Sequence, residues 1–444
     1  MTRHVQSAIR NPKSAIAVAL STLGILIATL HSAGTELPPG WSLTLTSGDT
    51  ALAELIQNLL LFIPLGVSLV MAGVRPLRAV AIGAGLSMTV EFLQQWIPGR
   101  DPSLGDIICN ANSTAIGVAL VVFAPRWLWP IGRRAAWQAL ATAGLAVLVW
   151  LGTGAVLRPI FPDPPYQDVW TPDWHYWGHY EGKVVAASLG SLALSQRTIE
   201  DRDPSFMPLR VTVAAASRPP GRDSPLIAIL DSNGAKVVVL GVDGRDVVLH
   251  YNTHVWPLTL EPLDIRWRGA LAAIRPKDTF TAQTWRGEHG VCLGVNSARR
   301  CGFGYTIGDG WKLIFYPEHF PIWLLSFINM AWLAGWTIGV GWWAARSGGG
   351  EILRRRDQAA AKSGDGEGAA IAWVAIVIAL LGVLLVPMIT GLKMTPVIEW
   401  FGAVAGLAAG WSLGSPQLGS PQFRRRSTSP PQFRAAAVPR RPWG

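Results

Sequence analysis

Eight apolar stretches, each about as long as a membrane-spanning helix, constrain the fold of this chain more than any other feature. The hydrocarbon core of a bilayer is roughly 30 Å thick, so about 20 mostly apolar residues are needed to cross it as a helix. Half of the 444 residues are hydrophobic and only 15% are charged, which excludes a purely soluble enzyme. The predicted spans are 14–31, 55–72, 79–96, 107–124, 135–151, 321–345, 369–385 and 396–413.

The basic residues between these stretches predict which way the helices run. Cytoplasmic connections of membrane proteins collect Lys and Arg. Here the basic groups fall in every second connection, namely at Arg75 and Arg78, in 126–134, in 346–362 and in 424–426. We therefore expect both termini in the cytoplasm and the long interval 152–320 outside. Because these groups account for much of the net charge of +10, the charge gives no reason to expect a nucleic-acid partner.

Composition divides the chain further. The segment 346–368 is rich in Gly and Arg, and the segment after 413 consists mainly of Ser, Pro, Gln and Arg, a composition typical of disorder. We predict a cytoplasmic N-terminus 1–13, a five-helix domain 14–151, an extracytoplasmic β domain 152–320, one helix 321–345, a cytoplasmic linker 346–368, two helices 369–413 and a disordered basic cytoplasmic tail 414–444.

The outward interval has the pattern of short β-strands. Runs that alternate or are rich in Val are separated by turns with Asn-Gly and Asp-Gly, residues that tolerate positive φ. The predicted strands are 209–213, 225–230, 236–242 and 246–251, with a last hairpin at 304–315. An antiparallel meander, most simply a sandwich, accounts for this pattern. The predicted fold class is therefore a multispanning α-helical membrane protein with about eight transmembrane helices and an inserted all-β domain.

The strand-turn-strand sequence at 240–249 resembles the concanavalin A-like and laminin G-like jelly-roll domains. This resemblance rests only on the pattern of strands and turns. The resemblance implies a domain that binds glycans. Glycan hydrolysis would need two carboxylates about 5–10 Å apart. Since no matching pattern of acidic residues occurs on the predicted strands, we expect binding or a structural role for this domain.

Two of the three cysteines, Cys292 and Cys301, lie in the outward interval. Disulfides persist in oxidising compartments outside the cytoplasm. We expect these two residues to form a disulfide that closes a loop of ten residues. The alternative is a pair of free thiols.

Two His-x-x-x-His spacings, His175/His179 and His250/His254, invite a metal interpretation. On a helix this spacing brings two imidazoles to one ion. In an extended strand four residues span roughly 13 Å, which separates the rings. The second pair lies on a predicted strand and the first in an aromatic stretch, so we expect no metal site and no other cofactor.

Polar residues in the first half of the chain occupy costly positions. Glu91 lies well inside a predicted span, where a carboxylate costs a few kcal/mol unless it is paired or faces water. Two interpretations stay open: a functional pocket, or a buried polar network that only locks three helices together. At 1.5 Å per residue, Asn58, Glu91 and Asn110 fall roughly 6–8 Å below one outer surface, with Gln94 beside Glu91 and with Arg100 and Asp106 above them in the connecting loop.

The same residues carry a resemblance to the VanZ-like membrane protein family over about 15–151. The matching motifs are Asn58, Pro64-Leu65-Gly66, Glu91-x-x-Gln94, Pro98-Gly99-Arg100 and Asp106-x-x-x-Asn110 up to Gly117. The resemblance implies a multispanning protein of the bacterial envelope, and the founding member is associated with low-level tolerance of a glycopeptide antibiotic. It implies no established reaction, so whether this chain is an enzyme stays open.

We expect a bacterial inner-membrane protein whose outer-leaflet pocket handles a polar or lipid-linked cell-envelope component, with membrane lipids and a cell-wall precursor or envelope glycan as partners. The alternative is a non-catalytic anchor or sensor whose outward β domain binds glycan. In the first hypothesis Glu91 and Asp106 are the acid and base, and the substrate-binding residues are Asn58, Gln94, Arg100 and Asn110.

Overall fold

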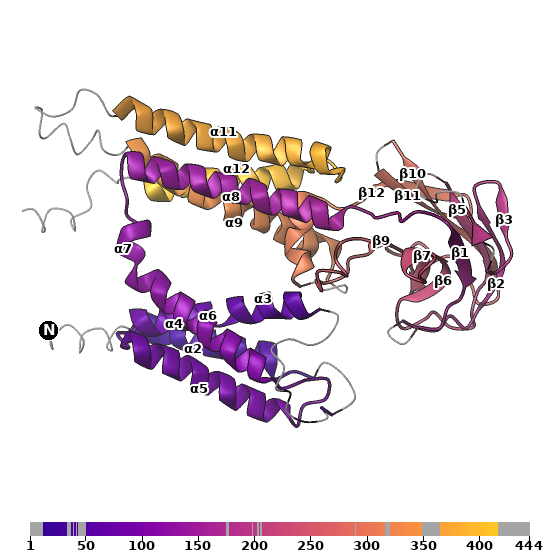
Figure 1. The fold of residues 1–444 in the computed structure, drawn as a ribbon, viewed down its shortest axis with the longest axis horizontal. Helices are drawn as coiled ribbons and strands as arrows, with labels where there is room; N and C mark the ends of the chain where they lie inside the picture. The colour runs from indigo at the N-terminus through magenta and orange to yellow at the C-terminus, as the bar shows by residue number, and fades with distance from the viewer. Residues whose placement is uncertain are drawn as a thin grey trace, which may run out of the picture.

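Two helical bundles and a β sandwich make up the chain (Figure 1). The computed structural model describes residues 12–32, 37–38, 40, 42, 50–174, 177–197, 199–201, 204, 207–288, 290–315, 320–348 and 365–415. The first bundle contains α2 (Pro12–Thr29), α3 (Ala51–Leu61), α4 (Ile63–Met71), α5 (Pro76–Gln94) and α6 (Leu104–Val122), and the short α7 (Ala124–Trp127) follows it. The second contains α8 (Arg133–Leu157), α9 (Ile322–Gly348), α11 (Asp365–Thr390) and α12 (Val397–Gly414).

All eight predicted spans lie on helices. Seven of the described helical segments are long and apolar enough to cross a membrane, and α3 and α4 count as one of them. The remaining apolar helix, Lys13–Thr29, is shorter. Pro64 explains why the second span is divided, because proline removes a backbone donor and the helix is interrupted at Phe62, between α3 and α4.

The start of α2 and the end of α12 lie at one end of the bundles, and the β domain lies at the other (Figure 1). Most of the predicted N-terminal segment 1–13, most of the linker 346–368 and nearly all of the tail 414–444 lie outside the described residues.

Glycines let α9 and α12 pack closely in the second bundle. A Cβ at Gly402 would lie 2.3 Å from the carbonyl oxygen of Met330, and one at Gly410 would lie 2.0 Å from that of Ile338. Distances of this size exclude any side chain. The four-residue glycine spacing of α12 thus permits backbone contact with α9.

The β domain is a sandwich of two antiparallel six-stranded sheets, ordered β4-β1-β6-β7-β8-β9 and β12-β11-β10-β5-β2-β3. Apolar residues of both sheets, such as Val211 and Leu240, share one core. The strands are β1 (Tyr166–Trp170), β2 (Lys183–Leu189), β3 (Leu192–Leu194), β4 (Ile199–Glu200), β5 (Leu209–Ala214), β6 (Ser224–Leu230), β7 (Lys236–Asp243), β8 (Asp246–Tyr251), β9 (Ile265–Trp267), β10 (Thr279–Gly287), β11 (Gly290–Val295) and β12 (Ala298–Phe303).

The four predicted strands coincide with β5 to β8, and Cys292 and Cys301 form the expected disulfide between β11 and β12. The predicted hairpin at 304–315 is wrong. This segment forms the 3-10 helix η2 (Ile307–Leu313). A reciprocal capping box between Thr306 and Asp309 starts a helical turn there, and this local arrangement outweighs the alternating pattern.

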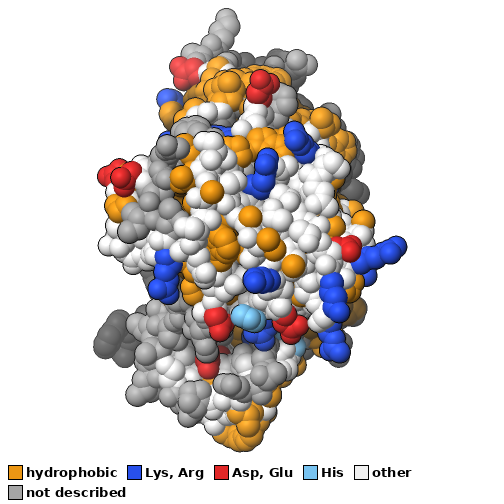
Figure 2. Space-filling model, turned by 90° about the vertical axis from the view of Figure 1, so that its right-hand side faces the viewer, with side chains coloured by type: hydrophobic (Ala, Val, Ile, Leu, Met, Phe, Trp, Pro, Cys, Tyr) orange, Lys and Arg blue, Asp and Glu red, His pale blue; other side chains and the backbone are white. Residues whose placement is uncertain are grey.

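Backbone hydrogen bonds join the β domain to both bundles. The N–H of His254 donates to the carbonyl of Val156 near the end of α8 over 3.1 Å, and the N–H of Leu52 in α3 donates to that of Thr259 over 3.1 Å. On the face of the molecule at the β-domain end, Lys and Arg side chains are spread among apolar and polar atoms and do not form one patch (Figure 2). This pattern gives no support to a nucleic-acid surface there.

Candidate functional site

Two acidic side chains of the first bundle converge on Ser103, at the end where the β domain lies. Glu91 lies in the last turn of α5 and is 2% exposed, and Asp106 lies in the first turn of α6. The backbone N–H of Ser103 donates a hydrogen bond of 3.0 Å to Oε2 of Glu91. The hydroxyl of Ser103 donates one of 2.8 Å to Oδ2 of Asp106. One residue therefore links both carboxyl groups.

Ser103 occupies this position because it begins a helix. It is the N-cap of α6, with extended backbone angles, and its hydroxyl oxygen accepts a hydrogen bond of 3.0 Å from the N–H of Asp106. Ser103 is absent from the set of residues predicted from the sequence. The signal was present, since Ser followed three residues later by an acid before an apolar run is a helix-start pattern.

Asn58 joins the same group from α3. Its amide donates a hydrogen bond to Oδ1 of Asp106, so that both oxygens of this carboxylate are bonded. The structure thus brings together Asn58, Glu91 and Asp106 around Ser103. The depth estimate instead groups Asn58 and Glu91 with Asn110 and puts Asp106 in the loop above them, whereas Asp106 is a residue of α6 and bonds directly to Asn58.

Gln94 and Asn110 lie near this group but bond elsewhere. The amide of Gln94 donates to the carbonyl of Thr29 in α2 over 2.9 Å. The amide of Asn110 donates to the hydroxyl of Ser87 in α5 over 3.0 Å, and its buried carbonyl oxygen has no hydrogen-bond partner among the described residues. These two residues fix helix to helix in the described structure.

Arg100 lies in the connection between α5 and α6, as predicted, and caps the end of α2. Its Nε donates to the carbonyl of His31 over 3.1 Å, and its Nη2 donates to that of Ala28 over 3.1 Å. Burial lowers the pKa of Arg100, although the nearby Glu91 carboxyl acts in the opposite direction. Among the described residues this guanidinium forms no ion pair with either acid.

Close backbone contacts hold the helices that carry the acids. A Cβ at Gly66 of α4 would lie 2.2 Å from the carbonyl oxygen of Thr114 in α6. A Cβ at Gly117 of α6 would lie 2.3 Å from that of Ile63. Both glycines belong to the motifs that carry the VanZ-like resemblance. They allow α4 and α6 to approach at backbone distance and so place Asn58 beside Asp106.

The arrangement is suited to proton exchange or to holding a polar group. Across the described ranges, neither Glu91 nor Asp106 forms an ion pair. Glu91 accepts from the backbone N–H of Ser103, and Asp106 accepts from the Ser103 hydroxyl and the Asn58 amide. Two carboxyl groups bonded to one serine are groups of the type that can act as acid and base. The same contacts also suit a network that only locks the helices.

A second group of buried acids lies in the other bundle and was not predicted. Glu399 of α12 is 1% exposed, and its Oε1 accepts hydrogen bonds from Thr306 over 2.6 Å and from Asn329 of α9 over 3.0 Å. Asp309 of η2 forms an ion pair of 2.6 Å with Lys312. Burial alone would raise the pKa of Asp309, but the Lys312 charge and the hydrogen bonds hold it below its usual value. The sequence signal that could have revealed this group is Glu399, a charged residue in the first turn of the last span.

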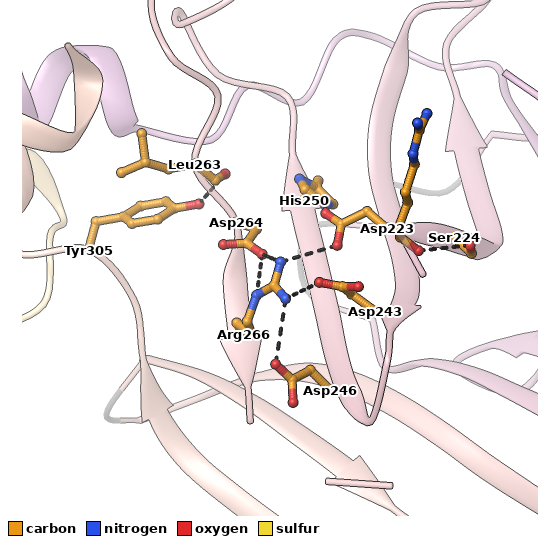
Figure 3. Close-up of polar contacts among 10 residues, drawn as sticks. Asp223, Ser224, Asp243, Asp246, His250, Leu263, Asp264, Arg266 and Tyr305 are labelled. Atoms are coloured by element: carbon orange, nitrogen blue, oxygen red, sulfur yellow. Dashed lines mark hydrogen bonds and ion pairs between the residues drawn. The ribbon is translucent and has the colours of Figure 1, made fainter. Parts of the chain in front are cut away.

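Acidic side chains of the β domain surround Arg266 (Figure 3). Burial acts to lower the pKa of this guanidinium, but the surrounding carboxylates raise it above its usual value. His250 also bonds to the group, through an oxygen of Asp223 at 3.1 Å. The carboxylates that contact Arg266 are those of Asp223, Asp243, Asp246 and Asp264.

One subset of this cluster has metal-ligand types. Asp223, His250 and Asp264 each offer an atom within 4.8 Å of the others. The cationic position between the two aspartates is filled, because Nη2 of Arg266 lies 3.1 Å from Asp223 and 2.7 Å from Asp264. A salt-bridge network explains the cluster better than a metal. His254 lies in the turn after β8, apart from the strand that carries His250, and His175 lies outside the described residues.

The fold defines a multispanning α-helical membrane protein with an inserted β sandwich. Residues 12–125, about a quarter of the chain, match the model of the VanZ/LLP1 family. The match covers α2 to α6 and reaches α7, so the first bundle is a VanZ-like domain. It ends before α8, which packs against α9 and α11 in the second bundle. No curated protein and no solved structure matches the chain, so the likeness of the sandwich to concanavalin A-like and laminin G-like domains stays a prediction.

Proposed function

We propose that the VanZ-like domain handles a polar or lipid-linked component of the bacterial cell envelope, and that Glu91 and Asp106 are the acid and base of its site. The observation that carries the proposal is the convergence of both carboxyl groups on Ser103. Buried acids in membrane helices are costly and usually serve a function. Asn58 adds an amide to the same site.

The proposal places the protein in the inner membrane, with both termini in the cytoplasm and the sandwich outside. Arg75 and Arg78 lie at the start of α5, and Arg133 and Arg134 at the start of α8, at the end opposite the β domain. This supports a cytoplasmic location of that end. The disulfide in the sandwich supports an oxidising compartment at the end where the β domain lies.

Cysteine labelling tests this orientation. In a Cys109→Ala background, a membrane-impermeant maleimide added to intact cells should label Ser232→Cys, which lies in the exposed turn after β6, and should leave Arg126→Cys in α7 unlabelled. Labelling of Arg126→Cys alone would reverse the orientation and place the acid pair on the cytoplasmic side.

The functional test compares carboxamide variants of the full chain. Bacteria that express the wild type, Glu91→Gln or Asp106→Asn are assayed for glycopeptide susceptibility and for the pool of lipid-linked cell-wall precursor. Loss of a general acid or base typically costs about 10²–10⁴ in rate, so either variant should abolish the effect of the wild type. The control is Glu367→Gln, which removes an exposed carboxylate 3.7 Å from Arg133.

Melting temperatures of the purified variants separate loss of function from loss of fold. The proposal fails if both carboxamide variants fold and retain the full effect of the wild type. That result would favour the rival function, a non-catalytic anchor or sensor whose β domain binds glycan. The rings of Trp174, Trp177 and Trp256 give this rival little support, because Nζ of Lys236 lies 4.4–5.6 Å from their centroids and covers them.

A further inference from the structure

A cavity of about 500 Å³ lies where the β sandwich meets the second bundle. Its walls come from the segment after α8, from strands β8 to β12 and from the connection between α11 and α12. None of the lining residues belongs to the VanZ-like domain. The cavity is therefore separate from the acid pair of Glu91 and Asp106, and what it binds does not depend on the function proposed for that pair.

Positive charge dominates the lining. Arg158, Arg286 and Lys393 border the cavity, against one carboxylate, that of Glu288. Over the described part of the chain, no ion pair or hydrogen bond involves the side chains of these three basic residues. Three cations that lie around one hollow without a bonded acid create a field that attracts anions.

Lys393, in the connection between α11 and α12, also borders a second hollow. This second hollow, of about 360 Å³, lies beside the first and shares Phe303, Tyr305 and Lys393 with it. Its lining adds four basic residues and two acids, namely Arg266, Arg268, Arg300, Lys312, Asp264 and Asp309. Lys393 thus lies between two cavities. Its backbone N–H donates to the carbonyl of Tyr305 over 2.9 Å, which fixes the connection against the sandwich.

Apolar side chains also line the cavity. Phe161, Val291, Phe303 and Leu392 contribute ring and aliphatic surface next to the basic residues. Met394 also lines the cavity and is 50% exposed, and Ile389, near the end of α11, is 71% exposed. In a membrane-spanning helix, exposed apolar side chains face lipid tails. The cavity therefore opens beside a lipid-facing surface.

From these observations we propose that the cavity binds the phosphate-bearing head group of an anionic phospholipid. Arg158, Arg286 and Lys393 hold the phosphate, and the acyl chains lie along Ile389 and Met394. Arginine and lysine both bind phosphate, and arginine does so with a two-point fork. A soluble anion would use the basic residues but would gain nothing from the apolar surface at the end of α11.

Binding of fluorescent phosphatidylglycerol to the full chain in detergent micelles tests the proposal. Each basic residue near an anionic lipid contributes about a fivefold gain in affinity. The triple variant Arg158→Gln, Arg286→Gln, Lys393→Gln should therefore bind about a hundredfold more weakly. The charge-retaining variant Arg158→Lys, Arg286→Lys, Lys393→Arg should keep most of the binding. Lys183→Gln, an exposed residue of β2 outside the lining, is the matched control and should bind as the wild type does.

Competition distinguishes the sources of the phosphate. Unlabelled phosphatidylglycerol should displace the probe, whereas phosphatidylcholine and millimolar inorganic phosphate should not. Undiminished binding by a folded glutamine triple variant would overturn the proposal, as would equal competition by phosphatidylcholine. Full displacement by inorganic phosphate would also overturn it, because the site would then be one for a soluble anion.

Discussion

The backbone N–H of Ser103 lies 3.0 Å from a carboxylate oxygen of Glu91, and this hydrogen bond ties the loop before α6 to the last turn of α5. The bond satisfies a buried acid with a backbone donor, which cannot be removed by changing the side chain. The Ser103 hydroxyl is therefore free to bond to Asp106, donating to its carboxylate and accepting from its backbone N–H. Backbone and side chain of one residue thus hold the two acids at a common point.

Ser103→Ala should lower the stability of the protein by about 1–2 kcal/mol, because it removes an N-cap hydroxyl and leaves an oxygen of Asp106 without its donor. Ser103→Thr keeps the hydroxyl and should retain most of the stability. The measurement is the thermal midpoint in detergent, followed by Trp fluorescence. Ser412→Ala, which removes an exposed hydroxyl bonded to its own helix, is the control. An unchanged midpoint for Ser103→Ala would contradict the role given to this side chain.

Gly117→Ala should destabilise the VanZ-like domain, because the added Cβ would lie 2.3 Å from a backbone oxygen of α4 and the two helices would have to separate. The expected cost is about 1–3 kcal/mol. Gly85→Ala is matched in chemistry, but a Cβ there meets no atom within 4 Å, so this variant should be neutral or slightly stabilising. Equal midpoints for the two variants would refute the close contact between α4 and α6.

Arg266→Met should destabilise the β domain by about 3–5 kcal/mol, because it leaves aspartates unpaired around a side chain that is only 7% exposed. Burial alone would raise the pKa of Asp223, but His250 and Arg266 hold it below its usual value. A lowered carboxyl pKa stabilises the folded state above the ordinary pKa of Asp, about 4. This contribution is lost as the pH falls through the folded value.

The pH dependence of unfolding checks this account of Arg266. The wild type should lose stability as the pH falls below about 4, and Arg266→Met should show a smaller loss over the same range because the pKa of Asp223 is no longer held down. Arg210→Gln, which removes an exposed cation of β5, should follow the wild-type profile. A wild-type profile for Arg266→Met would show that the ion pairs contribute nothing to the acid sensitivity.

The helices and part of the site could be predicted because their signals are local. Apolar length alone located the spans, and a rise of 1.5 Å per residue placed Asn58 and Glu91 at one depth. The contacts of Arg100 could not be predicted in this way. Its partners are carbonyls of Ala28 and His31, about 70 residues away, and backbone acceptors carry no sequence signal.

The remaining features that could not be predicted from the sequence lie in the second bundle and the sandwich. The alternating residues of 304–315 matched a strand, yet Thr306 and Asp309 cap each other and start a helical turn. β1 pairs with β6 across about 60 residues, and such long-range partners are set by the packing of the two sheets. The partners of Glu399, Thr306 and Asn329, come from segments that meet only in the folded chain.

The central claim is that Glu91 and Asp106 act as one unit, and the double variant Glu91→Gln, Asp106→Asn tests it most directly in the glycopeptide-susceptibility assay. Residues that act together in one step are not additive. The account predicts that each single variant abolishes the effect of the wild type and that the double variant loses no more than either. Folded single variants that each retain the full effect, with a double variant that does the same, would contradict it.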